Sequence, residues 1–296
     1  MREEVRDSIR TTDGGSFETD VSTEINEILA DYNDRDIEAI QDHLNEIKKI
    51  IGEEIEGSID LKFGGSVSKN TYVDGLSDID TLLFIDKTEL TDSAPKDVLE
   101  YIASQLNGTL NGYTNIECGK LAVTIDFDDG NKIQILPAMK KGEGFKIPSI
   151  DGTKWSKVVR PDKFASKLTE VNKSINNNVV PAIKLAKGII SQFPEDQQLK
   201  GYHIESIAIK AFQRYPNSEK TTKKALLTHF FEKAKEIVKK PITDSSNQSF
   251  HVDGYLGNEN SKKRRAASNM LNKVFEKMER ANVSCSAAAW SEILGR

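Results

Sequence analysis

The sequence predicts an α+β fold in two parts: a mixed, mostly antiparallel sheet flanked by helices, followed by an all-helical half. The apolar run at 81–85 is typical of a buried strand, and 121–138 alternates like two strands joined by the turn DDGN. After Pro161, apolar residues recur at helical spacing. We therefore expect one domain over 1–160, a helical domain over 161–296, and a cleft between them.

Composition and charge limit the possible functions. The chain has 296 residues, of which 37% are hydrophobic and 29% are charged, enough for packed cores under a polar surface. It has no long apolar run and no apolar signal region in MREEVRDSIRTTDGG, so we expect no membrane span and a cytoplasmic protein. Cys118 and Cys285 are expected to be reduced thiols. The net charge of −5 argues against long nucleic acid as a partner, because its phosphates favour a basic protein.

Three segments precede the sheet. Residues 1–20 are polar and contain Gly14 and Gly15, and we expect a loose arm there. A helix is expected over 19–33, where apolar residues have helical spacing, and another over 35–56. The length of the second helix suits a spine joining the two domains, but an ordinary packing helix explains the pattern equally well.

The stretch 61–86, LKFGGSVSKNTYVDGLSDIDTLLFID, carries the candidate chemistry. Asp78 and Asp80 alternate, so they point to one strand face, roughly 6–7 Å apart. Two such carboxylates suit Mg²⁺, which prefers oxygen ligands and often completes its shell with substrate phosphates. Gly65 and Ser66 would allow close backbone approach and offer a hydroxyl to phosphate, beside free N–H groups if a helix begins there. For either half alone, a surface hairpin is the alternative.

These residues resemble a known superfamily. A Gly-Ser pair followed a dozen residues later by D-x-D on a strand is similar to the polymerase-beta nucleotidyltransferases. The fuller run GGSVSKNTYVDGLSDIDTLLFID resembles the bacterial cGAS/DncV-like nucleotidyltransferases (CD-NTases), the oligonucleotide cyclases of CBASS anti-phage defence. The resemblance implies a polymerase-beta-like core and a helical domain. It also implies an enzyme that uses Mg²⁺ (or Mn²⁺) at Asp78 and Asp80 to join nucleoside triphosphates, with Gly65 and Ser66 on the β- and γ-phosphates.

The same resemblance implies a third carboxylate just before a Leu-Pro pair, but this chain has Gln134 in that position. If the hairpin connector has three residues, with Gly130 in the left-handed conformation, Asp126 and Gln134 share one polar face. Asp126 is then the candidate third catalytic and metal-binding residue, with Gln134 beside the nucleotide. Three alternatives remain: Asp126 as a solvated strand residue, Gln134 as a neutral supporting group, or a site with two carboxylates.

Between the motifs and around the hairpin, the pattern is less regular. We expect a helix over 95–106 and a glycine-interrupted loop over 107–119. Residues 140–160, rich in glycine and lysine, are expected to form a loop or short hairpin beside the cleft, or a solvated linker.

In the second half, two lysines and a tyrosine are candidates for nucleotide binding. Lys184 and Lys187 lie among apolar neighbours, where a lysine is costly unless its charge reaches water or an anion. In the synthases that the chain resembles, a lysine holds the donor triphosphate and an S-Y or G-Y pair on the next helix stacks on the base. Lys187, with Lys184 as second choice, and Tyr202 match these positions. His203 is interpreted as a capping or packing residue and 262–265 as a solvated helix start. Helices are expected over 162–175, 180–191, 201–212, 220–238 and 262–280.

The resemblance extends to partners. The IQILPA and GYHIES segments look like those of clade D enzymes, some of which act with a HORMA-domain partner and a AAA+ remodeller. This implies a cyclic trinucleotide, built largely from ATP, that activates an effector protein. The rivals are a linear nucleotidyltransferase acting on RNA or protein, a noncatalytic nucleotide sensor, and a purely structural interaction module.

Overall fold

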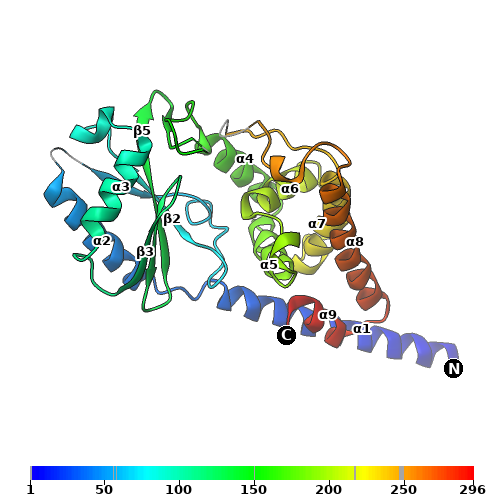
Figure 1. Cartoon of the computed structure of the whole chain (residues 1–296). Coiled ribbons are helices and arrows are strands. Elements are labelled where there is room, and N and C mark those ends of the chain that lie inside the picture. Colours follow the sequence, from blue (N-terminus) through cyan, green and yellow to red (C-terminus); the bar gives the residue numbers. More distant parts are fainter. Residues whose placement is uncertain (1, 56, 58, 150, 217, 247–249) are drawn as a thin grey trace.

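The computed structural model describes residues 2–55, 57, 59–149, 151–216, 218–246 and 250–296. It has two lobes: a mixed sheet with helices packed on one face, and a group of helices beside it (Figure 1). The expected α+β class is confirmed. Within the described part of the chain, no helix is both long and apolar enough to cross a membrane.

The sheet has the strand order β1-β2-β5-β4-β3, with β6 paired to β5. Strands β2 and β5 run parallel, and the other paired strands run antiparallel. This arrangement places β2, which carries the D-x-D motif, next to β5 in the middle of the sheet. The strands are β1 (Asp60–Phe63), β2 (Ile79–Phe84), β3 (Tyr113–Cys118), β4 (Val123–Phe127), β5 (Lys132–Lys141) and β6 (Gly144–Lys146).

The β4–β5 hairpin has the predicted register. Asp126 pairs with Lys132, the connector 128–130 has three residues, and Gly130 has a φ of 89°. The glycine-interrupted loop expected over 107–119 is wrong in part, because Tyr113–Cys118 forms the edge strand β3. None of its residues is buried, so the strand lacks the clear alternation by which a half-buried strand is recognised.

Helices α2 (Ile37–Glu54) and α3 (Pro95–Leu106) pack on one face of the sheet. The Asp36 side chain caps α2 by accepting the Ala39 backbone N–H at 2.9 Å. A short 3₁₀ turn, Glu89–Asp92, leads into α3, which has Pro95 in its first turn. Because these helices cover one side of the sheet, the polar side chains at the start of β2 are free to face the second lobe.

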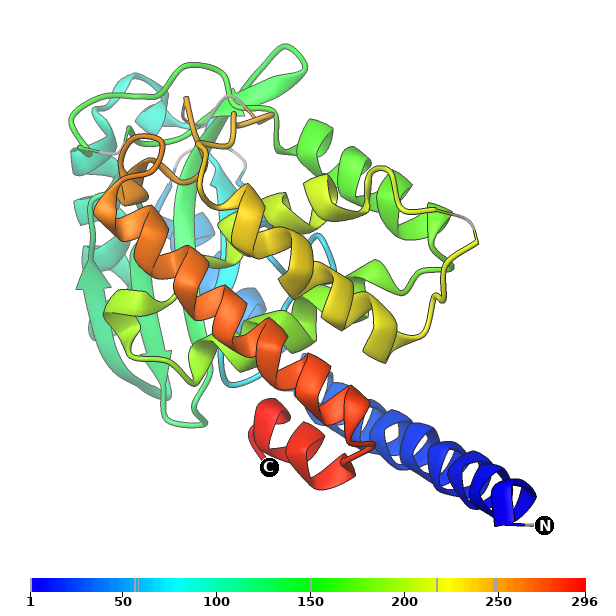
Figure 2. The same ribbon diagram turned by 90° about the vertical axis from the view of Figure 1, so that its right-hand side faces the viewer.

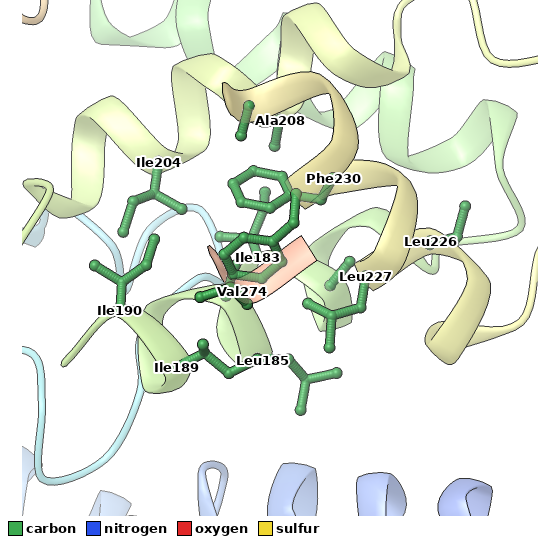
Figure 3. Packing of buried hydrophobic residues seen from close by; sticks show 14 of the residues in the cluster. Ile183, Leu185, Ile189, Ile190, Ile204, Ala208, Leu226, Leu227, Phe230 and Val274 are labelled. Carbon is green, nitrogen blue, oxygen red and sulfur yellow. The ribbon is translucent and has the colours of Figure 1, made fainter. Parts of the chain in front are cut away.

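The helical lobe has its own core, in which aromatic and aliphatic residues of α5, α6, α7 and α8 interdigitate (Figure 3). The helices predicted in this half are present, but the sequence missed α9. The elements are α4 (Pro161–Ser174), α5 (Val179–Ser191), η2 (Glu195–Gln197), α6 (Gly201–Phe212), α7 (Lys223–Ile237), η3 (Gly254–Leu256), α8 (Lys262–Val283) and α9 (Ala287–Leu294).

The first helix, α1 (Arg2–Asp31), is longer than expected; its second half packs against the helical lobe, and its N-terminal end projects away from it (Figure 2). Its buried side chains, from Phe17 to Leu29, belong to the core of that lobe. The loose arm expected over 1–20 is therefore wrong. Gly14 and Gly15 lower helix propensity, by about 1 kcal/mol each relative to alanine, but do not end this helix. The division at residue 160 separates the sheet from α4, while α1 joins the second lobe by packing.

Candidate active site

A cleft of about 390 Å³ lies where the loop after β1 and the start of β2 face helices α5 and α6. Two predicted groups of residues meet here, one from each lobe. The predicted residues that line the cleft are Gly65, Ser66, Asp78, Asp80, Lys187 and Tyr202.

The carboxylates of Asp78 and Asp80 form the acidic side of the cleft. Asp78 directly precedes β2, and Asp80 is the second residue of that strand. Burial raises the pKa of both carboxyl groups, and the charge of Asp78 raises the pKa of Asp80 further. Two carboxylates whose ionised forms are disfavoured by burial and mutual repulsion gain from a shared cation. Their oxygen atoms fit a hard divalent metal ion such as Mg²⁺.

The Gly64-Gly65-Ser66 segment wraps against Asp80. Gly65 has a φ of +47°, and a Cβ atom there would lie 1.5 Å from Oδ2 of Asp80, so this position requires glycine. The backbone N–H of Ser66 donates to the Asp80 carboxylate, which opposes the rise in its pKa. No helix begins here: the segment is a turn, closed by the Ser68 N–H donating to the Gly64 carbonyl at 3.0 Å.

Gln134 is on β5, which lies between the strand of the Asp78–Asp80 motif and the strand that carries Asp126. It pairs with Asp80 across β2 and β5, and its Nε2 donates to Oδ2 of Asp78 at 2.7 Å. Asp126 lies one strand further away, because β4 pairs with β5 and not with β2. Its Oδ1 is 3.1 Å from Nζ of Lys132.

The structure therefore brings Gln134, and not Asp126, against the aspartate pair. Among the described residues, no three histidine, cysteine or carboxylate side chains are grouped to hold a metal ion. The role of Asp126 as a third metal ligand remains a prediction.

A buried glutamate joins the two lobes at the floor of the cleft. Glu205 of α6 is 1% exposed, with Oε2 2.5 Å from Nζ of Lys69 and Oε1 3.0 Å from Nζ of Lys187. The Thr71 hydroxyl donates to the same carboxylate at 2.5 Å. Burial alone would raise the pKa of Glu205, but the lysines and Thr71 hold it below its usual value. We call Glu205, Lys69 and Lys187 the Glu205 cluster.

Tyr202 is held on both its ring and its hydroxyl. Its ring packs against Phe164, with centroids 4.5 Å apart, and Nζ of Lys69 lies 5.2 Å from its centroid. Its hydroxyl donates to Oδ1 of Asp244 at 2.8 Å. A fixed aromatic ring at the edge of the cleft could stack against a nucleotide base.

Lys184 does not reach this cleft. Its Nζ donates to Oδ1 of Asn33 at 2.5 Å and lines a different cavity, beside the end of α1. Lys187 instead donates to the Thr71 carbonyl at 2.8 Å and to Glu205. Of the two sequence candidates, Lys187 lines the cleft and Lys184 does not.

Sequence reasoning missed Lys69 and Glu205. Glu205 lies in the apolar stretch GYHIESIAIKAF, and a fully buried glutamate is rare unless it is paired, so the stretch signals that a partner exists. The sequence does not identify the partners, because Lys69 and Lys187 are 136 and 18 residues away from it.

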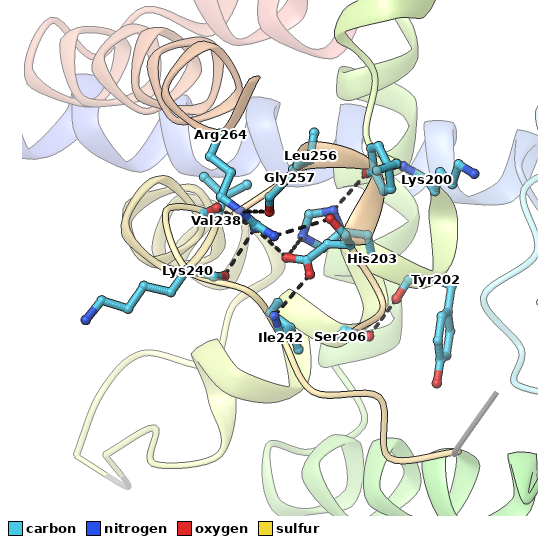
Figure 4. Close-up of polar contacts among 12 residues, drawn as sticks. Lys200, Tyr202, His203, Ser206, Val238, Lys240, Ile242, Leu256, Gly257 and Arg264 are labelled. Carbon is cyan, nitrogen blue, oxygen red and sulfur yellow. Dashed lines mark hydrogen bonds and ion pairs between the residues drawn. The ribbon is translucent and has the colours of Figure 1, made fainter. Parts of the chain in front are cut away.

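A second buried network fixes α6 from its other side (Figure 4). Arg264 of α8 is fully buried, and its Nη1 lies 2.6 Å from Oδ2 of Asp253. His203 of α6 lies beside the same carboxylate, with Nε2 3.4 Å from Oδ2, and its Nδ1 is 2.9 Å from the Tyr255 hydroxyl. We call Arg264, Asp253 and His203 the Arg264 cluster. The interpretation of 262–265 as a solvated helix start is therefore wrong at Arg264, whereas that of His203 as a packing residue fits.

No protein-family model matches the sequence, and no curated protein matches it significantly. Solved structures do match. DncV from Escherichia coli bound to 3'-deoxy GTP aligns with a TM-score of 0.66 at 12% identity, over 100% of this chain and 91% of that chain. CdnC from E. coli MS115-1 with ATP gives 0.60 at 14% identity, over 93% and 92%.

The CdnE cyclic dinucleotide synthase of Elizabethkingia meningoseptica, with GTP and Apcpp, gives a TM-score of 0.58 at 16% identity, over 80% of this chain and 90% of that chain. The chain thus has the fold of the CD-NTases, as expected from the resemblance of its Gly-Ser and D-x-D motifs.

Proposed function

We propose that the protein is a metal-dependent nucleotidyltransferase that joins nucleoside triphosphates, mainly ATP, into a cyclic oligonucleotide. The product we propose is a cyclic trinucleotide. One observation carries the proposal: a single cleft is lined by the aspartate pair, the Gly65-Ser66 turn, three lysines and a tyrosine. The similarity of the fold to CdnC with ATP and to cyclic dinucleotide synthases supports it.

Each part of the cleft has a role in this reaction. The Gly65-Ser66 turn allows the β- and γ-phosphates to approach the backbone, and Ser66 offers a hydroxyl to them. Lys69 and Lys187 supply positive charge at the same end, where negative charge develops on the leaving pyrophosphate. Tyr202 stacks on the donor base.

Asp78 and Asp80 would hold Mg²⁺ or Mn²⁺, and Gln134 would orient Asp78 through its hydrogen bond. When bound, the metal would lower the pKa of the acceptor hydroxyl and neutralise negative charge on the phosphates. A carboxamide is neutral and does not take up a proton near pH 7, so Gln134 cannot itself serve as the general base.

We further propose a signalling role in the cytoplasm, within CBASS-type antiviral defence, in which the product activates an effector. A HORMA-domain activator is proposed because the E. coli MS115-1 CdnC, of the same fold, has been solved in complex with a HORMA protein. A AAA+ remodeller would act on that activator.

The test is incubation of the purified protein with all four nucleoside triphosphates and Mg²⁺ or Mn²⁺, with and without a HORMA-domain partner. Phosphatase-treated products are identified by mass spectrometry. We expect a resistant product of cyclic trinucleotide mass that is absent from the Asp78→Asn/Asp80→Asn variant. ATP binding without any product, even with the partner, would instead favour a noncatalytic sensor, which the amide at Gln134 makes the second candidate. Nucleotide addition to RNA or protein would favour a linear transferase.

A glycine pair gives a matched control. Gly65→Ala would push a methyl group into the Asp80 carboxylate, whereas Gly75→Ala has open space at a φ of +71°. Both substitutions carry the backbone cost of a positive φ, about 1 kcal/mol. We expect activity to be lost only in Gly65→Ala, and equal loss in both would indicate general destabilisation.

A further inference from the structure

A second cavity, of about 400 Å³, lies behind the loop that follows β1, at the junction of α1 and α2. Its size is within the range of about 300–1,000 Å³ typical of small-molecule sites. It shares two walls with the cleft: the loop containing Asn70, which follows Lys69, and α5, whose Lys184 and Lys187 face different cavities. The residues that line it are Leu29, Tyr32, Asn33, Arg35, Ile37, Asn70, Tyr72, Val180, Pro181, Lys184 and Lys223.

Three cationic residues line this cavity. Lys184 is only 8% exposed, and its ammonium group is held at the wall by the Asn33 side chain. Arg35 lies over the Tyr72 ring, with its Cζ 5.3 Å from the centroid. Lys223, at the start of α7, lines both this cavity and the neighbouring one, where its ammonium group donates to Oδ1 of Asn26. The three side chains come from three separate segments, so the cluster is a product of the fold.

The cavity offers these cations no negative partner. No carboxylate is among its lining residues, and within the described part of the chain none of the three forms an ion pair. Asp74 lies near by and accepts the Tyr72 hydroxyl at 3.3 Å, but it does not line the cavity. Burial, followed by the charges of Arg35 and Lys187, lowers the pKa of Lys184 to about 8, so the ammonium form is under strain that an anion would relieve.

We propose that this cavity is a second anion-binding site, which takes a phosphate group, free or as part of a small metabolite, between Arg35, Lys184 and Lys223. Arginine and lysine are the usual phosphate ligands, and the Asn33 and Asn70 side chains can complete the polar contacts. Leu29, Tyr32 and Pro181 form an apolar wall beside the charges, which leaves room for an organic group attached to the phosphate. The proposal goes beyond the nucleotidyltransferase function and does not depend on it.

The experiment is a titration of the full chain with inorganic phosphate, followed by backbone amide NMR. Divalent metals are removed with EDTA, so that Asp78 and Asp80 repel anions from the cleft, and chloride keeps the ionic strength constant. A parallel titration uses phenyl phosphate. We expect saturable shifts at 32–37, 70, 180 and 182–184 and not at 65–66 or 77–80. Tighter binding of phenyl phosphate supports a phosphorylated metabolite as the ligand, and equal binding supports free phosphate.

Charge-removing variants locate the site. Lys184→Gln and Lys223→Gln should each weaken phosphate binding by about tenfold, the value of one charge-assisted contact. Lys233→Gln, on α7 but outside the cavity, should leave it unchanged. Lys223 is only partly buried, so its variant keeps the test valid if Lys184→Gln does not fold. Shifts that do not saturate, that centre on the cleft, or that persist unchanged in Lys223→Gln would overturn the proposal.

Discussion

The two ionic clusters on α6 are both buried, but they are surrounded differently. In the Arg264 cluster, the guanidinium group also donates to backbone carbonyls, those of Val238 at 3.0 Å and Gly257 at 3.0 Å. None of its three residues lines the cleft. In the Glu205 cluster, by contrast, all three charged residues line the cleft, and both lysines have one carboxylate as their counter-charge.

The difference separates a structural ion pair from an exchangeable one. A buried charge whose hydrogen bonds are all made by the protein has nothing to gain from a ligand. Lysines that share a single carboxylate at the wall of a cavity can bind an incoming triphosphate without breaking the fold. We therefore expect the Arg264 cluster to affect stability and the Glu205 cluster to affect both stability and nucleotide binding.

The largest effect is expected from Arg264→Met. The substitution leaves the buried Asp253 carboxylate without its counter-charge, which should lower the free energy of unfolding by about 3–5 kcal/mol. Urea unfolding measures this value. Arg265→Met, one residue further along α8 and exposed, is the matched control and should change stability little. A loss as small as that of the control would show that the cluster is not structural.

Glu205→Gln should be intermediate. It keeps the shape of the side chain but leaves Lys69 and Lys187 without a negative partner, at a cost of about 2–3 kcal/mol. Because the freed lysines attract triphosphate, ATP should raise the melting temperature of this variant more than that of the wild type. Thermal unfolding with and without ATP tests this, with Glu232→Gln, on α7 and outside the cleft, as control. Equal stabilisation by ATP in all three proteins would contradict the exchangeable role.

His203→Gln should change how stability depends on pH. Burial lowers the pKa of His203 to about 4 in the folded protein, against about 6.5 in the unfolded chain. The unfolded state therefore binds the extra proton between these values, so wild-type stability falls as the pH drops from about 6.5 to 4. We expect the variant to remove about 1–3 kcal/mol of this fall, as measured by urea unfolding across the range. An unchanged pH profile would refute the assignment.

Tyr202→Phe should have the smallest effect. It removes the hydrogen bond to Asp244, at about 1 kcal/mol, but keeps the ring packed on Phe164. ATP affinity should change by less than about twofold. Tyr202→Ala, which removes the ring, should weaken ATP binding clearly, and calorimetric titration compares the two. Similar losses in both variants would show that the hydroxyl, and not the ring, contributes to binding.

The sequence predicted what depends on local pattern. The Gly65-Ser66 turn is close in the chain to Asp78 and Asp80. The spacing of the two aspartates alone places both on one side of a strand. The odd connector of the β4–β5 hairpin, likewise, fixed the shared face of Asp126 and Gln134. These features were predictable because turn length and strand alternation determine them.

The errors arise where the partner is distant in the chain. Lys184 and Lys187 are one turn apart on α5, and only the packed lobes show that the first lines the cavity beside α1 and the second lines the cleft. Burial of Arg264 likewise depends on Asp253 and on carbonyls from loops that no helical pattern identifies. The surroundings of a buried charged side chain thus depend on the tertiary structure and do not follow from the local sequence pattern.

The packing of α1 against α5, α7 and α9 has a consequence for the order of folding. Ser291 of α9 donates to the Glu24 carboxylate of α1 at 2.6 Å across 267 residues, so the helical lobe contains segments from both ends of the chain described here. The sheet lobe lies between these segments in the chain, and all its strands precede α4. During synthesis on the ribosome, we expect the sheet lobe to fold first and α1 to wait with its apolar face uncovered until the later helices emerge. The chaperone requirement of the nascent chain should therefore centre on α1.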